Sequence, residues 1–219
     1  MRIQGVLFDM DGVLFDSEEI GTQVVLAISA ENGWPVTREM VYRTLGTTSA
    51  ESARIYRETI GPAFDPERLW PTFKRRLSAL AAQGKIPPKP FVRETLCALR
   101  RLGVPCAVAS SSARATVEAY LNAAALGDAF HAVVSGDMIA RSKPAPDIYL
   151  EAAARLCADP ARCIAVEDAP NGLRAARASG ARTVMVPDLI PYTPALAPYC
   201  DHVFARVDEI LPLLDEKSM

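Results

Sequence analysis

The amino-acid sequence predicts an α/β fold: a doubly wound, Rossmann-like parallel sheet with an inserted helical-bundle cap domain. Short apolar segments alternate with amphipathic helical segments over most of the chain, which is typical of βαβ units and a parallel sheet. One interval, residues 9–103, breaks this alternation because it contains only helical patterns. Polar residues also follow four of the apolar segments, at the sheet edge where such folds bind their ligands.

Five short apolar runs, rich in β-branched residues, are the expected buried strands. They are Ile3–Phe8, Val104–Ala109, Ala132–Val134, Cys163–Val166 and Arg182–Val186. Helices are expected at Pro90–Leu102, after Ser112 as an N-cap, at Asp147–Cys157 and at Asn171–Ser179. Gly103 and Gly180 follow two of these helices, at the position just past a helix end that favours glycine.

The interval between the first two strands carries helix-start signals in place of strands. Capping residues occur at Ser17, Thr37, Thr48 with Glu51, and Asp65 before Pro66. Three prolines, Pro87, Pro88 and Pro90, mark the return to the α/β pattern. We therefore expect a helical cap domain at 17–85, inserted between the two parts of an α/β core, 1–16 and 86–219.

The composition is that of a folded globular protein and argues against several classes of partner. Half of the 219 residues are hydrophobic, and the formal net charge of −2 gives no general attraction for nucleic acid or for an anionic membrane. No apolar run has the length of a bilayer span. Five irregularly spaced cysteines and two histidines favour free thiols over a disulfide framework or a zinc site. Because too few residues precede the first strand to form a signal peptide, we expect a cytoplasmic protein, and we expect a monomer.

Four polar clusters follow expected strands. They are Asp9-Met10-Asp11-Gly12, Ser110-Ser111-Ser112, Lys143-Pro144 and Glu167-Asp168. Because the carboxyl ends of parallel strands share one edge of a sheet, we expect four carboxylates, a hydroxyl and an ammonium to lie together there. Carboxylates in close contact destabilise one another unless a cation compensates for their charge. A hard divalent cation with oxygen ligands provides this compensation, and Mg²⁺ suits a site that also holds a phosphate.

The remaining groups of these clusters suit a bound phosphate. Lys143 and the Ser110 hydroxyl are left to hold phosphate oxygens, and Gly12 lets the backbone come close to the ligand. The amides after Asp9 can form an anion-binding concavity. Each residue alone has an ordinary explanation as a helix cap, a turn residue or a solvated lysine. Four such clusters at one sheet edge favour a functional site instead.

The same segments resemble a known family. The strings VLFDMDGVLFDSE, AVASSS, SKPAPDIY and AVEDAPNG, in this order, are similar to motifs I to IV of the haloacid dehalogenase superfamily. The long helical interval after the first motif resembles the subclass with a four-helix cap. That subclass contains sugar phosphatases, phosphoglycolate phosphatases and β-phosphoglucomutase. The resemblance spans essentially the whole chain.

The resemblance implies a role for each site residue. Asp9 would be the nucleophile that forms an aspartyl-phosphate, and Asp11 the general acid and then the general base. The implied phosphate-binding residues are Gly12, Ser110, Ser111 and Lys143. The implied Mg²⁺ ligands are the Asp9 carboxylate, the Asp11 backbone carbonyl and Asp168, with Glu167 as a further ligand, directly or through water. An acid at the position of Asp11 implies cleavage of a P–O bond.

The activity implied is Mg²⁺-dependent hydrolysis of a small phosphate monoester. Hexose phosphates, polyol phosphates and phosphoglycolate all stay open, because nothing in the cap sequence names a substrate. One alternative is phosphoryl transfer of the β-phosphoglucomutase type. That mutase has a histidine at the position of Gly21 and an arginine at the position of Ser49. Glycine cannot relay a proton as the histidine does, and serine cannot hold a phosphate as the arginine does, so these two residues favour hydrolysis. Another alternative is a non-enzymatic phosphoacceptor module of the response-regulator type, against which the cap, the spacing of Asp9 and Asp11, and the chain length all count.

Overall fold

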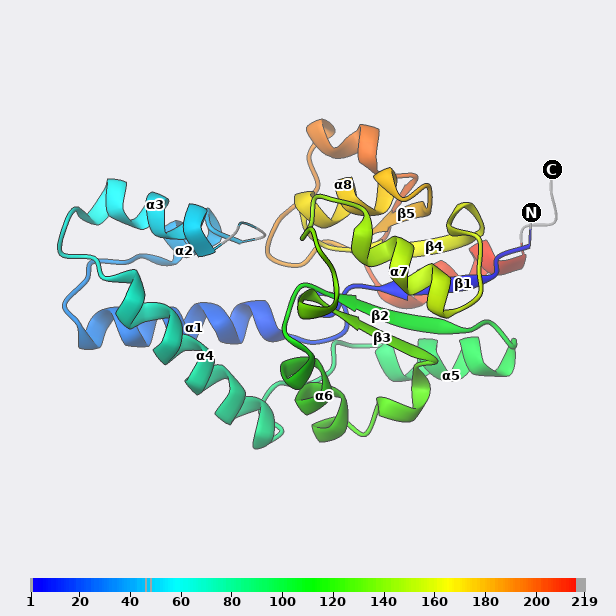
Figure 1. Ribbon diagram of the computed structural model, residues 1–219, viewed down its shortest axis with the longest axis horizontal. Helices are drawn as coiled ribbons and strands as arrows, with labels where there is room; N and C mark the ends of the chain where they lie inside the picture. The colour runs from blue at the N-terminus through cyan, green and yellow to red at the C-terminus, as the bar shows by residue number, and fades with distance from the viewer. Residues whose placement is uncertain (1, 46, 48, 216–219) are drawn as a thin grey trace.

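A six-stranded parallel sheet forms the centre of the protein. The computed structural model describes residues 2–45, 47 and 49–215, and the order of the strands in its sheet is β3-β2-β1-β4-β5-β6 (Figure 1). The strands are β1 (Gly5–Phe8), β2 (Cys106–Ser110), β3 (Ala132–Ser135), β4 (Cys163–Glu167), β5 (Arg182–Met185) and β6 (His202–Val203). All neighbouring strands run parallel. The predicted fold class is confirmed, and β6 is a strand that the sequence pattern did not indicate.

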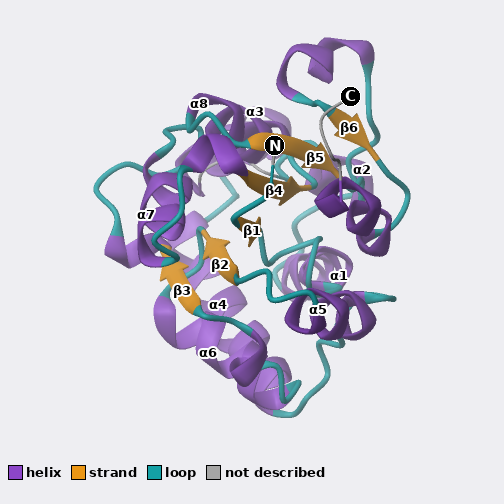
Figure 2. Ribbon diagram, turned by 90° about the vertical axis from the view of Figure 1, so that its right-hand side faces the viewer, coloured by secondary structure: helices purple, strands orange, loops and turns teal. Residues whose placement is uncertain are grey.

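Helices cover both faces of this sheet, as a fully buried parallel sheet requires (Figure 2). The helices of the core are α5 (Val92–Arg101), α6 (Arg114–Ala123), α7 (Asp147–Arg155) and α8 (Pro170–Ala178). Short 3₁₀ helices are η1 (Gly127–Ala129), η2 (Gly136–Met138), η3 (Pro160–Arg162), η4 (Pro194–Tyr199) and η5 (Val207–Asp215). Val6 and Phe8 of β1 pack with α5, α6 and η5, whereas Leu7 packs with α7 and α8. The alternation of side chains along β1 thus joins the two apolar layers.

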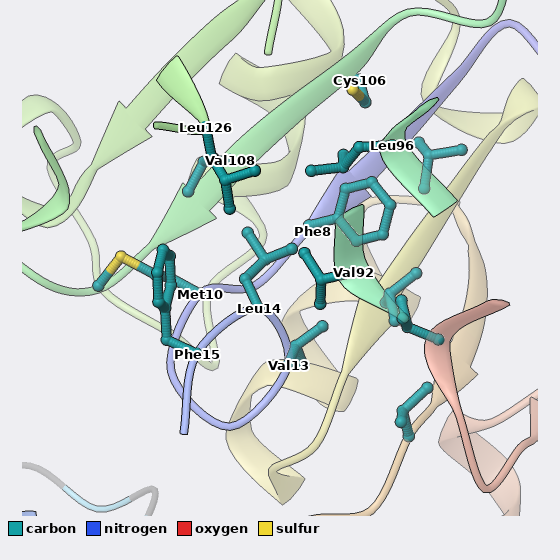
Figure 3. Packing of buried hydrophobic residues seen from close by; sticks show 14 of the residues in the cluster. Phe8, Met10, Val13, Leu14, Phe15, Val92, Leu96, Cys106, Val108 and Leu126 are labelled. Carbon is teal, nitrogen blue, oxygen red and sulfur yellow. The ribbon is translucent and has the colours of Figure 1, made fainter. Parts of the chain in front are cut away.

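The loop after β1 is anchored in one of these layers (Figure 3). Met10, Leu14 and Phe15 have no exposed surface and lie in the same cluster as Phe8 and Leu96. This burial fixes the backbone that carries Asp9 and Asp11. Met10 between the two acids and Leu14 and Phe15 after them therefore hold the loop in place, which is a condition for a precisely positioned site.

Four helices between β1 and β2 form a separate group beside the sheet (Figure 1). They are α1 (Ser17–Glu31), α2 (Arg38–Tyr42), α3 (Ser49–Ile60) and α4 (Pro66–Ala82). They have their own apolar cluster, in which Trp34 and Tyr56 each lie 5.1 Å from Phe64 between ring centroids. Helix α4 also contacts α6 of the core. We propose 17–85 as the cap domain on this basis. No helix in the described part of the chain is both long and apolar enough to cross a bilayer.

The two connections between cap and core run side by side. Phe15 forms an antiparallel bridge with Pro88. Asp16 donates its backbone N–H to the Pro87 carbonyl at 3.0 Å, and Lys89 donates its own to the Leu14 carbonyl at 2.9 Å. The cap is therefore joined to the core through one short paired segment next to the β1 loop.

Two of the predicted helix caps are wrong and two are confirmed. Thr37 accepts a hydrogen bond from the Met40 N–H, and Asp65 accepts two such bonds at the start of α4. Ser17 and Ser112 do not cap helices: Asp16 and Ala113 hold the N-cap positions, and both serine hydroxyls donate to the Asp11 carboxylate. The predicted pair of Thr48 with Glu51 cannot be placed, since Thr48 lies outside the described residues.

Candidate active site

The predicted site residues meet at the carboxyl ends of β1 and β4, the adjacent strands at which the sheet order reverses. A cleft of about 410 Å³ opens at this edge. Six charged residues line it: Asp9, Asp11, Glu18, Lys143, Glu167 and Asp168. Asp9 directly follows β1, and Glu167 is the last residue of β4. The parallel register of these two strands therefore sets the acidic side chains side by side.

Lys143 bridges two of the carboxylates. Its ammonium contacts Oδ1 of Asp9 and lies 2.5 Å from Oε1 of Glu167. Tyr149 donates its hydroxyl proton to the same Glu167 oxygen at 2.6 Å. The Lys143 Nζ also lies 5.1 Å from the centroid of the Tyr149 ring. These contacts, all at buried side chains, fix the ammonium beside Asp9, where it can neutralise charge on a bound anion.

Three carboxylates form a candidate metal site. One oxygen each of Asp9, Glu167 and Asp168 lies within 4.8 Å of the others, and all three residues are buried. Burial raises the pKa of Asp9 and of Asp168, and the neighbouring carboxylates raise both further, while Lys143 opposes the shift at Asp9. The cluster is thus short of positive charge. Three oxygen ligands with this deficit fit a hard divalent cation such as Mg²⁺.

Asp11 is held by two hydroxyl groups. Ser17 donates to its Oδ1 at 2.7 Å, and Ser112 donates to its Oδ2 at 3.1 Å. Burial raises the pKa of Asp11, and these hydrogen bonds lower it in part. An oriented carboxyl group with a raised pKa suits proton transfer to and from a substrate oxygen. Asp11 contributes no carboxylate oxygen to the metal cluster, so the role expected for it there rests on its backbone carbonyl.

Two glycines leave room for the acidic side chains. Gly12 has a φ of +79°, and a Cβ on it would lie 2.8 Å from Cγ of Asp168. A Cβ on Gly172, in the first turn of α8, would overlap the Glu167 carboxylate. The sequence analysis named Gly12 but missed Gly172, because only the packing of α8 against the end of β4 shows why a side chain is excluded there.

The three serines after β2 have different environments. Ser111 lines the cleft. Ser110 has no exposed surface, and its Oγ accepts a hydrogen bond from the Ser112 N–H at 3.1 Å. Phosphate binding by Ser110 and by Ser111 stays a prediction, and in this structure Ser111 is the one that borders the cleft.

Three further charged residues belong to the site and were missed by the sequence analysis. Glu18, in the first turn of α1, lines the cleft, and burial, with Asp11 and Asp9 nearby, raises its pKa to about 8. Asp188, which follows β5, pairs through Oδ1 with the ammonium of Lys89. Its Oδ2 is buried without a hydrogen-bond partner among the described residues. In the sequence Glu18 is an ordinary first-turn acid of a helix, and Asp188 is an ordinary loop residue.

Comparisons with known proteins show the family to which this fold and site belong. A family model described as haloacid dehalogenase-like hydrolase matches residues 3–180. Protein CbbY of Rhodobacter capsulatus is 34% identical over 197 residues, which cover 85% of this chain and 86% of CbbY. Hexitol phosphatase B of Escherichia coli (strain K12) is 31% identical over 189 residues, which cover 85% of this chain and 84% of that protein.

A solved structure is similar over nearly the full length. It is a mutant of CbbY from Rhodobacter sphaeroides in complex with xylulose-(1,5)bisphosphate, and it matches with a TM-score of 0.78 at 29% identity. The match covers 97% of this chain and 99% of the CbbY chain. The similarity therefore extends over the sheet and the helices inserted after β1.

Proposed function

This chain belongs to the haloacid dehalogenase-like hydrolase family, and from that premise we propose that it is a Mg²⁺-dependent phosphatase of small phosphate monoesters. The observation that carries the proposal is the meeting of Asp9, Glu167 and Asp168 within 4.8 Å beside the Lys143 ammonium. The similarity to hexitol phosphatase B supports a phosphate monoester as the substrate. A bound Mg²⁺ would supply positive charge to the phosphoryl oxygens and to the Asp9 carboxylate.

The proposed reaction has two steps. In the first, a carboxylate oxygen of Asp9 bonds to phosphorus while the bond from phosphorus to the ester oxygen breaks, and Asp11 gives its proton to that oxygen. In the second, Asp11 takes a proton from water as the water oxygen attacks the aspartyl-phosphate. Inorganic phosphate leaves, and both carboxyl groups return to their starting state. Lys143 neutralises charge on the transferring phosphoryl group throughout.

Net hydrolysis is part of the proposal, in preference to the mutase reaction. Gly21, at the position where the mutase has a histidine, has no side chain and so offers no group that could relay a proton. A Cβ placed on Gly21 would lie 3.5 Å from the Phe73 ring. The assay supplies β-glucose 1-phosphate with a trace of the 1,6-bisphosphate and follows glucose 6-phosphate and free phosphate separately. Glucose 6-phosphate that accumulates faster than free phosphate would establish the mutase reaction instead.

Phosphate release from a panel of phosphometabolites tests the main proposal. We expect release with Mg²⁺, none after chelation, and a loss of at least about a thousandfold in Asp9→Asn, since the amide is not a useful nucleophile. Asp128→Asn, the same substitution at an exposed position, is the control. Full activity of Asp9→Asn would refute the covalent scheme.

The expected location and oligomeric state also remain proposals. All five cysteines are free in the structure, which supports a protein of the reducing cytoplasm. We propose a monomer, and size-exclusion chromatography with light scattering tests this directly.

A further inference from the structure

A second cavity, of about 310 Å³, adjoins the cleft beneath the cap helices and is called the cap chamber here. Asp11, Glu18 and Thr47 border both the cleft and the chamber. Asp11 is the proposed acid for the leaving oxygen, so a phosphoryl group at Asp9 places the rest of the substrate beyond Asp11. The chamber is therefore the space available to the alcohol part of the substrate, an assignment that rests on the proposed function.

The chamber offers no cation to a second anionic group. No lysine, arginine or histidine occurs among the described residues that line it, and its charged residues are Asp11 and Glu18. The neighbours of Thr47 in the sequence, Gly46, Thr48 and Ser49, are uncharged residue types. Three arginines of the cap are paired with acids: Arg38 with Glu19, Arg54 with Glu51 and Glu58, and Arg76 with Glu31. The other four, Arg43, Arg57, Arg68 and Arg75, do not line the chamber.

The hydroxyl groups of the chamber are also committed as donors. Thr44 donates its proton to the Val41 carbonyl at 2.7 Å, so its 3.2 Å contact with Tyr56 uses the Tyr56 proton. Thr22 donates to the Glu18 carbonyl at 2.9 Å. An oxygen whose proton is used within the protein can only accept hydrogen bonds from a ligand. These hydroxyls therefore suit ligand O–H groups and give nothing to a phosphate or carboxylate.

The remaining surface of the chamber is apolar and acidic. Apolar side chains come from α1 and α4 and from the segment after α2: Val25, Phe73, Leu77 and Leu45. The Trp70 indole N–H, a neutral donor on a lining residue, is buried and has no hydrogen-bond partner among the described residues, so it can donate to a ligand oxygen but brings no charge. Glu18 has an acceptor oxygen in either protonation state, and in neither state does it carry positive charge. A second phosphate in this space would meet carboxyl groups and no compensating charge.

We propose that the cap chamber selects an uncharged, hydroxyl-bearing alcohol as the leaving group and rejects substrates with a second phosphate or a carboxylate. Acceptor oxygens match the hydroxyls of a polyol or sugar, and the apolar wall matches its C–H surface. The chain is then a phosphatase of monophosphates whose organic part is neutral.

Matched substrates test this selection. Glucitol 6-phosphate, 6-phosphogluconate and glucitol 1,6-bisphosphate share one carbon chain and differ at C1 in a hydroxymethyl, a carboxylate or a phosphate. Glycerol 3-phosphate and 3-phosphoglycerate form a shorter pair, and p-nitrophenyl phosphate reports the chemistry alone. For at least one of the two sets we expect kcat/KM of the neutral compound to exceed that of its anionic partners by about 100-fold or more.

The outcomes separate this inference from the proposed function. Anionic partners that are hydrolysed as fast as the neutral compounds overturn the selection alone, as does hydrolysis of p-nitrophenyl phosphate with neither neutral compound turned over. No release from any compound, p-nitrophenyl phosphate included, overturns the proposed function and the selection with it.

A charge placed in the chamber tests the cause of the selection. Leu45→Arg adds a cation to its wall, and we expect it to reduce the preference for glucitol 6-phosphate over the bisphosphate by about tenfold. Leu102→Arg, the same change at an exposed position on the core, is the control. An unchanged preference in a folded Leu45→Arg protein would overturn the electrostatic cause. If that variant does not fold, the wild-type comparison decides alone.

Discussion

Ser17, the first residue of α1, donates a hydrogen bond of 2.7 Å from its hydroxyl to Oδ1 of Asp11. The cap thereby contacts the proposed acid of the reaction directly. The hydrogen bond lowers the pKa of Asp11 and fixes the orientation of its carboxyl group. The position of α1 can consequently influence proton transfer in the core.

Ser17→Ala should slow turnover and shift its pH dependence. Loss of the donor raises the pKa of Asp11, so its acid form persists to higher pH and the alkaline limb of kcat/KM moves upward. We expect a drop in kcat of about three- to tenfold, in line with the net contribution of one typical hydrogen bond, about 0.5–1.5 kcal/mol. Ser29→Ala is the control, because Ser29 is buried in the same helix and donates only to the Val25 carbonyl. An unchanged pH profile in Ser17→Ala would contradict this coupling.

Gly12→Ala should abolish activity. The new methyl group would meet the Asp168 carboxylate, and the φ of +79° adds about 1–2 kcal/mol of backbone strain. Gly103→Ala provides a matched control, since Gly103 has a φ of +67° but no atom within 4 Å of an added Cβ. Both variants should melt at lower temperature, and only Gly12→Ala should lose phosphate release and Mg²⁺ affinity. Equal activity in the two variants would argue against the close approach of Gly12 and Asp168.

Tyr149→Phe should weaken Mg²⁺ binding with only a modest loss of stability. The substitution removes the donor to Oε1 of Glu167 and leaves Lys143 as the remaining partner of that oxygen. Loss of such a supporting group typically reduces metal affinity by about 10- to 100-fold, which Mg²⁺ titration of activity measures.

Tyr120→Phe is the comparison for this variant. The Tyr120 hydroxyl is buried with no hydrogen-bond partner in the described part of the chain, so its removal should leave the melting temperature unchanged or slightly raised. A similar loss of Mg²⁺ affinity in both variants would point to a packing effect and away from the Glu167 hydrogen bond.

The metal-free protein should lose stability as the pH rises from about 5.5 to 8. Burial raises the pKa of Glu18 to about 8 and raises that of Asp9, from ordinary values near 4. Between these values the folded chain binds more protons than the unfolded chain, so the free energy of unfolding falls with rising pH. Surface carboxylates with a lowered pKa, such as Glu19 and Asp147, are already ionised at pH 5.5. They therefore do not change the free energy of unfolding between pH 5.5 and 8.

Thermal melts at pH 5.5 and pH 8 check this dependence. We expect the metal-free melting temperature to be lower at pH 8 by roughly 3 °C or more. Mg²⁺ should raise it more at pH 8, because the metal binds ionised carboxylates. Glu18→Gln should reduce the pH dependence. A melting temperature that rises with pH in the absence of metal would contradict the raised pKa values.

The sheet and most of the charged site were predictable from the sequence because they depend on local patterns. Apolar runs identify β1 to β5, and the residue that follows a strand lies at its carboxyl end in any parallel sheet. Asp9 and Glu167 therefore lie side by side as expected, and Lys143 joins them from the loop after η2. The strand β6 was not predictable, because two residues paired only with β5 leave no pattern of their own.

The sequence by itself determined which chemical groups gather at the sheet edge, whereas the tertiary structure decided what each of them contacts. The Ser17 and Ser112 hydroxyls, predicted as helix caps, donate to the Asp11 carboxylate, which for Ser112 comes from a distant part of the chain. Glu18 enters the cleft only because the cap is attached through the paired segments at Phe15 and Pro88. The lack of a cation among the described residues that line the cap chamber likewise arises from helices that meet in space, since the direction of a side chain and its long-range neighbours are not local properties.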